Sequence, residues 1–139
     1  MKRVYLSYTS IILLLALILM LSGCGAISDE AQIRSVISGF CNAVNNQNWD
    51  NARSYCVYGS ETYDRITNWE YLTAQFGSEN LTMDYSFNIS NIIITGDYAT
   101  ADGFFTDIIT TNGESEEESG DQTMNLKKVD NSWKIYYII

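Results

Sequence analysis

Residues 81–95 read LTMDYSFNISNIIIT, and this stretch decides the fold. From Leu81 to Ser90 apolar and polar side chains alternate without interruption, which is the pattern of a strand with one buried face. The alternation then changes phase, because Ile92 and Ile94 are apolar at even positions. A β-bulge near Asn91 explains the change and would bend the strand.

Further strands are predicted downstream of this segment. A turn at Gly96-Asp97 leads into a second strand from Tyr98 to Thr111. An acidic solvated hairpin loop follows from Asn112 to Asp121 (NGESEEESGD). A third strand from Gln122 to Val129, a turn at Asp130-Asn131 and a fourth strand from Ser132 to Ile139 complete the predicted order of strands. The chain contains no proline, which is compatible with long strands that use every backbone N–H.

Upstream of Leu81 the apolar residues recur at helical spacing. The first predicted helix runs from Glu30 to Asn45, and its apolar stripe consists of Ile33, Val36, Ile37, Phe40 and Val44. Asp29 with Gln32 fits a capping box at its start.

Two shorter helices are expected to follow. The segment Asn45–Asn48 breaks the first helix, and Trp49, Ala52, Tyr55 and Cys56 mark a second one. Residues 60–65 have no clear pattern. Thr67 with Glu70 fits another capping box, which predicts a third helix that ends at Gly77.

Helices first and antiparallel strands afterwards make an α+β fold, with two to three N-terminal helices on a curved four-stranded meander. This order, with a bulged long strand and the closing segment LKKVDNSWKI at 126–135, resembles the nuclear transport factor 2-like superfamily, a cystatin-like cone. The resemblance covers residues 29–139. It implies a pocket between the first helix and the concave face of the sheet, and it implies that dimers through the sheet are frequent, although nothing in this sequence requires a homodimer.

The N-terminal 24 residues carry a second resemblance. Lys2 and Arg3 precede the unbroken apolar run from Ile11 to Leu21, which is typical of a secretory signal. The run ends in Leu21-Ser22-Gly23-Cys24, which resembles the lipobox of prokaryotic lipoproteins. The resemblance implies a signal peptide over 1–23, a lipid-anchored spacer over 24–28 and lipidation of the Cys24 thiol. The alternative is an uncleaved signal anchor, and both place the domain at a membrane, on its extracytoplasmic face.

The charge of the chain excludes one class of partner. The formal net charge is −9, and loss of Lys2 and Arg3 with the signal peptide leaves six basic against 17 acidic residues, a net charge of −11. Nucleic acid requires a basic face, so it is not an expected partner. Anionic lipid head groups would also repel such a domain.

Two cysteines remain in the domain. Export permits oxidation, so Cys41 and Cys56 are predicted to form a disulfide, worth roughly 3 kcal/mol for a loop of about 15 residues. The alternative is two buried free thiols.

Catalytic and metal-binding signatures are weak. Histidine is absent, which removes the usual nucleophile pairs and the commonest metal ligand, and no cofactor motif is present. Asp84 and Asp102 fall at outward strand positions, whereas Asp107 shares a face with Phe105 and Ile109. A carboxylate inside an apolar cone would have a raised pKa and could act as an acid or base. The acidic segment lacks the spacing of a calcium loop.

Aromatic residues supply the remaining candidate site. The candidate pocket-lining residues are Phe40, Trp69, Tyr85, Phe87, Phe105, Trp133 and Tyr137. The alternative is that these rings form a packed core. The sequence therefore predicts a non-catalytic module that binds a small apolar ligand or an envelope protein, and the competing class is an isomerase- or dehydratase-like enzyme.

Overall fold

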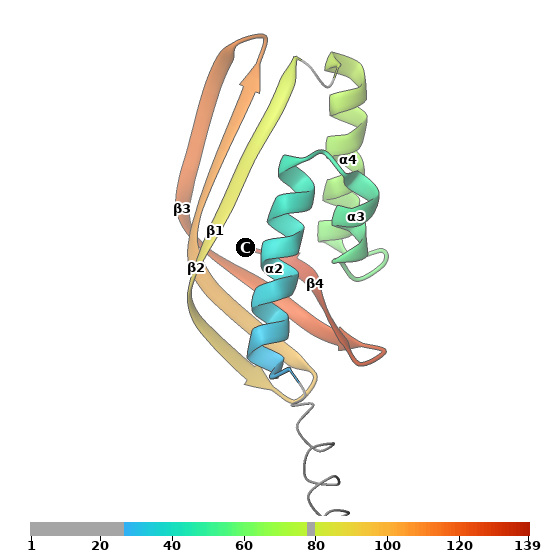
Figure 1. Cartoon of the computed structure of the whole chain (residues 1–139), viewed down its shortest axis with the longest axis vertical. Coiled ribbons are helices and arrows are strands. Elements are labelled where there is room, and N and C mark those ends of the chain that lie inside the picture. The colour runs from blue at the N-terminus through green and yellow to red at the C-terminus, as the bar shows by residue number, and fades with distance from the viewer. Residues whose placement is uncertain (1–26, 78–79) are drawn as a thin grey trace, which may run out of the picture.

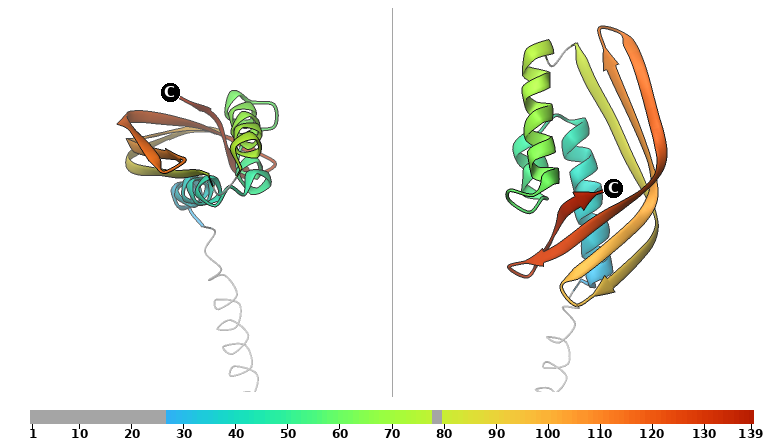
Figure 2. Two further views of the ribbon diagram at one scale, coloured as in Figure 1. Left: turned by 90° about the horizontal axis from the view of Figure 1, so that it is seen from above. Right: turned by 180° about the vertical axis from the view of Figure 1, so that it is seen from behind.

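The computed structural model describes residues 27–77 and 80–139, so the lipobox and Cys24 lie outside the described residues. Three helices precede four strands, and the strands form one antiparallel sheet in the order β1-β2-β3-β4. The elements are α2 (Asp29–Asn45), α3 (Trp49–Ser54), α4 (Glu61–Phe76), β1 (Leu81–Thr95), β2 (Tyr98–Thr111), β3 (Glu114–Val129) and β4 (Ser132–Ile138). Figures 1 and 2 show the helices together on the concave side of the curved sheet, which confirms the predicted α+β cone.

Helix α2 packs its apolar stripe against the sheet. Ile33, Ile37, Phe40 and Val44 are each at most 1% exposed, as the helical spacing predicted. The predicted capping box was wrong, because Ser28 is the N-cap and its side chain accepts a hydrogen bond from the Ala31 N–H. The Asp29 carboxylate is instead bonded to Lys128 and Trp133, on the hairpin of β3 and β4.

Helix α4 begins seven residues earlier than the capping-box pattern at Thr67 indicated. Its N-cap is Ser60, which accepts from the Tyr63 N–H, and residues 61–65, expected to be irregular, form its first turn. Polar residues dominate this turn, so it shows little apolar periodicity, but Thr62 and Ile66 lie one turn apart and are both buried. The predicted end at Gly77 is confirmed by its φ of 82°.

The bulge in β1 is confirmed. Pairing with β2 shifts register between Ile89 and Asn91, which is where the apolar alternation changes phase. Before the shift, Leu81, Met83 and Tyr85 are buried beneath the helices, and after it Ile92 packs against the core. The bulge thus keeps one face of a bent strand apolar.

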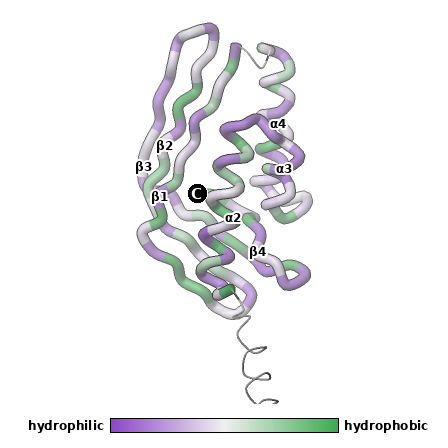
Figure 3. The backbone as a smooth tube through the Cα atoms, in the orientation of Figure 1, coloured by the Kyte–Doolittle hydropathy of each residue, from purple (hydrophilic) through white to green (hydrophobic). Residues whose placement is uncertain are grey.

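The prediction of an acidic hairpin loop from Asn112 to Asp121 was wrong. Only Asn112 and Gly113 form the turn, both with positive φ, and Glu114 already pairs with Thr111 at the start of β3. An Asn-Gly pair with this backbone favours a two-residue hairpin. The acidic side chains of this segment are exposed, and Figure 3 shows this end of β3 as hydrophilic to neutral. Charge there costs little and protects the strand edge that β4 does not cover.

The predicted disulfide is not formed. Cys41 and Cys56 are both free thiols and both buried. The Cys41 thiol lies against the Phe87 backbone of β1, whereas Cys56 forms a β-bridge with Ile135 of β4. The two cysteines therefore contact opposite edge strands of the sheet, Cys41 at β1 and Cys56 at β4.

Candidate functional site

A cavity of about 320 Å³ lies between helices α2 and α4 and the concave face of the sheet. All four strands and both helices contribute to its wall. The lining residues are Phe40, Thr62, Arg65, Ile66, Trp69, Tyr85, Phe105, Asp107, Glu118, Gln122 and Ile138. The volume is at the small end of the range for ligand pockets, so it suits a compact molecule.

One buried hydroxyl on the helical side of the cavity has no partner. Thr62 of α4 is 1% exposed, and its Oγ1 atom makes no hydrogen bond with any described residue. Buried polar groups are nearly always paired, because an unpaired one loses its water without compensation. The other buried threonine of α4, Thr73, bonds through its hydroxyl to the Trp69 and Glu70 carbonyls. Thr62 is therefore the exception that needs an explanation.

A carboxyl group on the sheet side has the same property. The Oδ1 atom of Asp107 is buried and has no hydrogen-bond partner among the described residues. Burial raises the pKa of Asp107, and the nearby acids Glu118 and Asp84 raise it further. Glu118 is the direct cross-strand partner of Asp107, so the two carboxyl groups share one face of the sheet.

Tyr85 is held firmly in the cavity wall. Its hydroxyl donates a hydrogen bond to Gln122 Oε1, and its ring meets Phe40 edge-on, with centroids 6.3 Å apart. Burial raises the pKa of Tyr85, and so do Cys41 and Asp107. The phenol thus stays neutral near pH 7 and can act only as a neutral hydrogen-bonding group.

The structure brings together four of the seven predicted lining residues, namely Phe40, Trp69, Tyr85 and Phe105. Phe87 packs beside the core instead, and Trp133 is buried in it with its indole N–H on Asp29. Tyr137 pairs with Asn125, away from the buried Met124 and Leu126.

The polar members of the wall were missed in the sequence: Thr62, Arg65, Glu118 and Gln122. Thr62 and Arg65 fall in the turn of α4 that lacks an apolar pattern. Glu118 and Gln122 would have been found by extending the alternation of Met124 and Leu126 backwards through the acidic segment. Asp107, which the sequence placed on the same face as Phe105 and Ile109, lines the cavity. Asp84 is exposed, and Asp102 accepts from the Thr123 hydroxyl, on the other face of the sheet.

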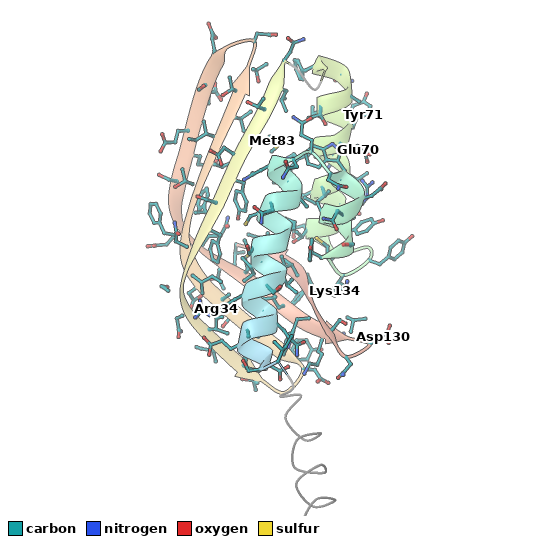
Figure 4. All side chains as sticks on the ribbon, viewed as in Figure 1. Arg34, Glu70, Tyr71, Met83, Asp130 and Lys134 are labelled. Carbon is teal, nitrogen blue, oxygen red and sulfur yellow. The ribbon has the colours of Figure 1, made fainter. Side chains whose placement is uncertain are left out.

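A larger hollow of about 820 Å³ lies outside the cone, between the α2–α3 turn and α4. Its polar side chains are already paired within the protein: Asn45 with Tyr85, Gln47 with the Leu81 carbonyl, and Glu70 with Arg53. Figure 4 shows Glu70 on α4, away from the sheet. Among the described residues, neither of the buried side-chain atoms without a partner lines this hollow, whereas both belong to residues that line the cone.

Metal binding has no arrangement to support it within the described ranges. Across residues 27–77 and 80–139, no three His, Cys, Asp or Glu side chains come together in a way that would hold a metal ion. In the same ranges no helix is long and apolar enough to cross a membrane.

Comparison with known proteins identifies the fold. No protein-family model matches the chain, and no curated protein matches it either. Solved structures do match. A protein of unknown function from Shewanella oneidensis, described as NTF-2 like, is 14% identical and superposes with a TM-score of 0.62, covering 80% of this chain and 97% of the other.

Two further structures agree. A ketosteroid isomerase-like protein from Erwinia carotovora atroseptica is 14% identical, with a TM-score of 0.59 over 78% of this chain and 91% of the other. A protein of unknown function with a cystatin-like fold from Nostoc punctiforme is also 14% identical, with a TM-score of 0.55 over 79% and 87%. The chain therefore has the NTF2-like, cystatin-like α+β fold. At this identity the likeness defines the fold and leaves the activity open.

Proposed function

We propose that this protein is a lipid-anchored, extracytoplasmic module that binds a small ligand in its cone. The observation that carries the proposal is a cavity of about 320 Å³ lined by Thr62 and Asp107, whose buried Oγ1 and Oδ1 atoms have no hydrogen-bond partner in the part of the chain that the structure describes. Aromatic walls would bury the body of a ligand, and its polar groups would satisfy these two atoms.

Gly120 offers a way to test the cavity. It lies between Glu118 and Gln122 on the same face of β3, and a Cβ atom there would meet only the Phe105 ring at 3.5 Å. Gly120→Leu should therefore fill the cavity mouth without displacing the backbone. A fragment screen by ligand-observed NMR, on the full chain in nonionic detergent, should find compounds that bind the wild type and are lost in this variant.

The matched control is Ser119→Leu, which adds the same side chain on the other face of β3, where Ser119 is exposed. It should retain the binders. The pocket proposal is wrong if no fragment binds the wild type, or if the hits bind Gly120→Leu as well as they bind Ser119→Leu.

Anchoring rests on the lipobox resemblance at residues 21–24. Two acyl chains on Cys24 would hold the domain stably at the membrane, whereas a single chain is marginal. Cys24→Ser should therefore move the protein from the membrane fraction to the soluble fraction, and Cys56→Ser should leave it in the membrane fraction. Retention of Cys24→Ser in the membrane would instead identify the apolar run at 11–21 as the anchor.

Asp107 supports a second candidate function, a carboxylate-dependent isomerase or dehydratase. A buried carboxyl group with a raised pKa exchanges protons at a pH nearer neutrality than an ordinary one does. The test is deuterium exchange at the α-carbons of cyclohexanone in heavy water. Faster exchange with the wild type than with Asp107→Asn would support this function, and equal rates would eliminate it for such ketones.

A further inference from the structure

Two carboxyl groups of the cavity wall lie opposite each other on β2 and β3. Asp107 and Glu118 are direct register partners, and such cross-strand pairs have Cβ atoms about 4.5–5.5 Å apart. Glu118 is largely exposed and lies at the mouth, whereas one oxygen of Asp107 is fully buried. Like charges placed directly opposite each other destabilise a sheet, so this pair needs a compensating group.

No cation among residues 27–77 and 80–139 supplies that compensation. Among the ion pairs formed by the described residues, none includes Asp107 or Glu118. Arg65 is the basic residue in the cavity wall, and its guanidinium pairs with Glu61 of the preceding helical turn at 3.3 Å. The wall thus carries two acids against one arginine that already has a carboxylate partner.

Two independent features of the same cavity point to a ligand that donates hydrogen bonds. Thr62 is 1% exposed and lines the cavity, and its hydroxyl has no partner among the described residues, so its oxygen can accept from a ligand N–H. The walls also include the rings of Phe40, Trp69, Tyr85 and Phe105. Aromatic faces attract cations, and the attraction is stronger where water is excluded.

We propose that the ligand of this cavity is a compact molecule with a protonated amine, whose ammonium group binds between the Asp107 and Glu118 carboxylates. The ammonium would donate charged hydrogen bonds to both acids, and the apolar part of the molecule would lie against the rings. The ammonium would thus supply the positive charge that no ion pair of the described residues gives to these two acids. This inference rests on the proposed function, because it assigns a chemical class to the same site.

Calorimetric titration of the full chain in nonionic detergent tests the assignment with three probes of nearly equal size. These are 2-phenylethylamine, protonated at pH 7, the neutral 2-phenylethanol and the anionic phenylacetate. The amine should bind at least about tenfold more tightly than the alcohol, which is the scale of a charge-assisted hydrogen bond. Phenylacetate should bind least, because both acids repel it.

Variants locate the effect at the two acids. Asp107→Asn and Glu118→Gln preserve side-chain size and should each weaken binding of the amine about tenfold while leaving the alcohol unchanged. The matched control is Glu117→Gln, which removes the same charge from the neighbouring exposed position and should change neither. Because Glu118 is exposed, its variant should fold normally even if Asp107→Asn does not.

The proposal is overturned if the alcohol binds as tightly as the amine, if Glu118→Gln behaves like Glu117→Gln, or if the amine does not bind. The first two outcomes leave the pocket itself intact when binding is still lost in Gly120→Leu. The pocket proposal itself fails only on a different result. In that case the fragment screen finds no compound that binds the wild type and is lost in Gly120→Leu.

Discussion

The side-chain amide of Asn45 forms two hydrogen bonds with the backbone of Tyr85. Its Oδ1 atom accepts from the Tyr85 N–H at 2.7 Å, and its Nδ2 atom donates to the Tyr85 carbonyl at 3.1 Å. Tyr85 lies on β1, an edge strand of the sheet, so the last residue of α2 replaces the strand that would otherwise pair there. This contact fixes the Tyr85 ring in the wall of the cavity.

Replacing Asn45 by alanine should destabilise the protein by about 2 kcal/mol, since it leaves two partly buried backbone groups unpaired. Urea denaturation monitored by circular dichroism measures the change. Asn46→Ala, which removes an exposed bond to the Asn42 carbonyl, should cost no more than about 0.5 kcal/mol. Equal losses for the two variants would contradict the role assigned to Asn45.

The hydroxyl of Thr62 should favour ligand binding but reduce the stability of the folded protein. Thr62→Val removes an unpaired buried hydroxyl at nearly constant volume, so the unfolding free energy should rise by about 1 kcal/mol. Thr73→Val is the matched control on the same helix, and it should destabilise, because that hydroxyl is hydrogen-bonded. Thermal denaturation compares the two, and a loss of stability in Thr62→Val would show that its hydroxyl has a partner in solution.

The raised pKa of Asp107 predicts how stability depends on pH. The folded protein holds the Asp107 proton more tightly than the unfolded chain does, and this difference stabilises the fold. The stabilisation is complete below pH 3.8, the ordinary pKa of the group, and is lost as the pH rises through the higher pKa of the folded state. Asp107→Asn cannot ionise, so its stability relative to wild type should increase as the pH rises from 3.8 through the folded pKa of Asp107, and should then stay constant. Denaturant titrations across this range, with Glu117→Gln for comparison, measure the difference, and parallel curves would contradict the shift.

Both domain thiols should be protected in the folded protein. Burial raises the pKa of Cys41 and of Cys56 to about 12, so neither forms an appreciable amount of thiolate at pH 8. Iodoacetamide should label them only after denaturation, and mass spectrometry of the unreduced exported protein should show no loss of two hydrogen atoms. Such a loss would restore the disulfide that the sequence predicted.

The regular elements of the fold could be predicted because they depend on local patterns. The alternation from Leu81 to Ile89 specifies a strand with one buried face, and the spacing of Ile33, Ile37 and Phe40 specifies a helix. The acidic run after Gly113 was misread for a physical reason. A strand exposed on both faces has no apolar alternation, so the Asn-Gly pair at 112–113 was the local signal of the tight hairpin, and the prediction of a long loop overlooked it.

The sequence by itself determined the order of helices and strands, the bulge, and the aromatic residues available for a pocket. The tertiary structure alone decided that Thr62, Asp107 and Glu118 share one cavity, and that Asp29 bonds to Lys128 and Trp133 rather than capping its helix. Periodicity reports which face of an element is apolar, because neighbouring residues along the chain fix it. It does not report which polar side chains meet, because that depends on how elements distant in sequence pack and on which groups they leave without a partner.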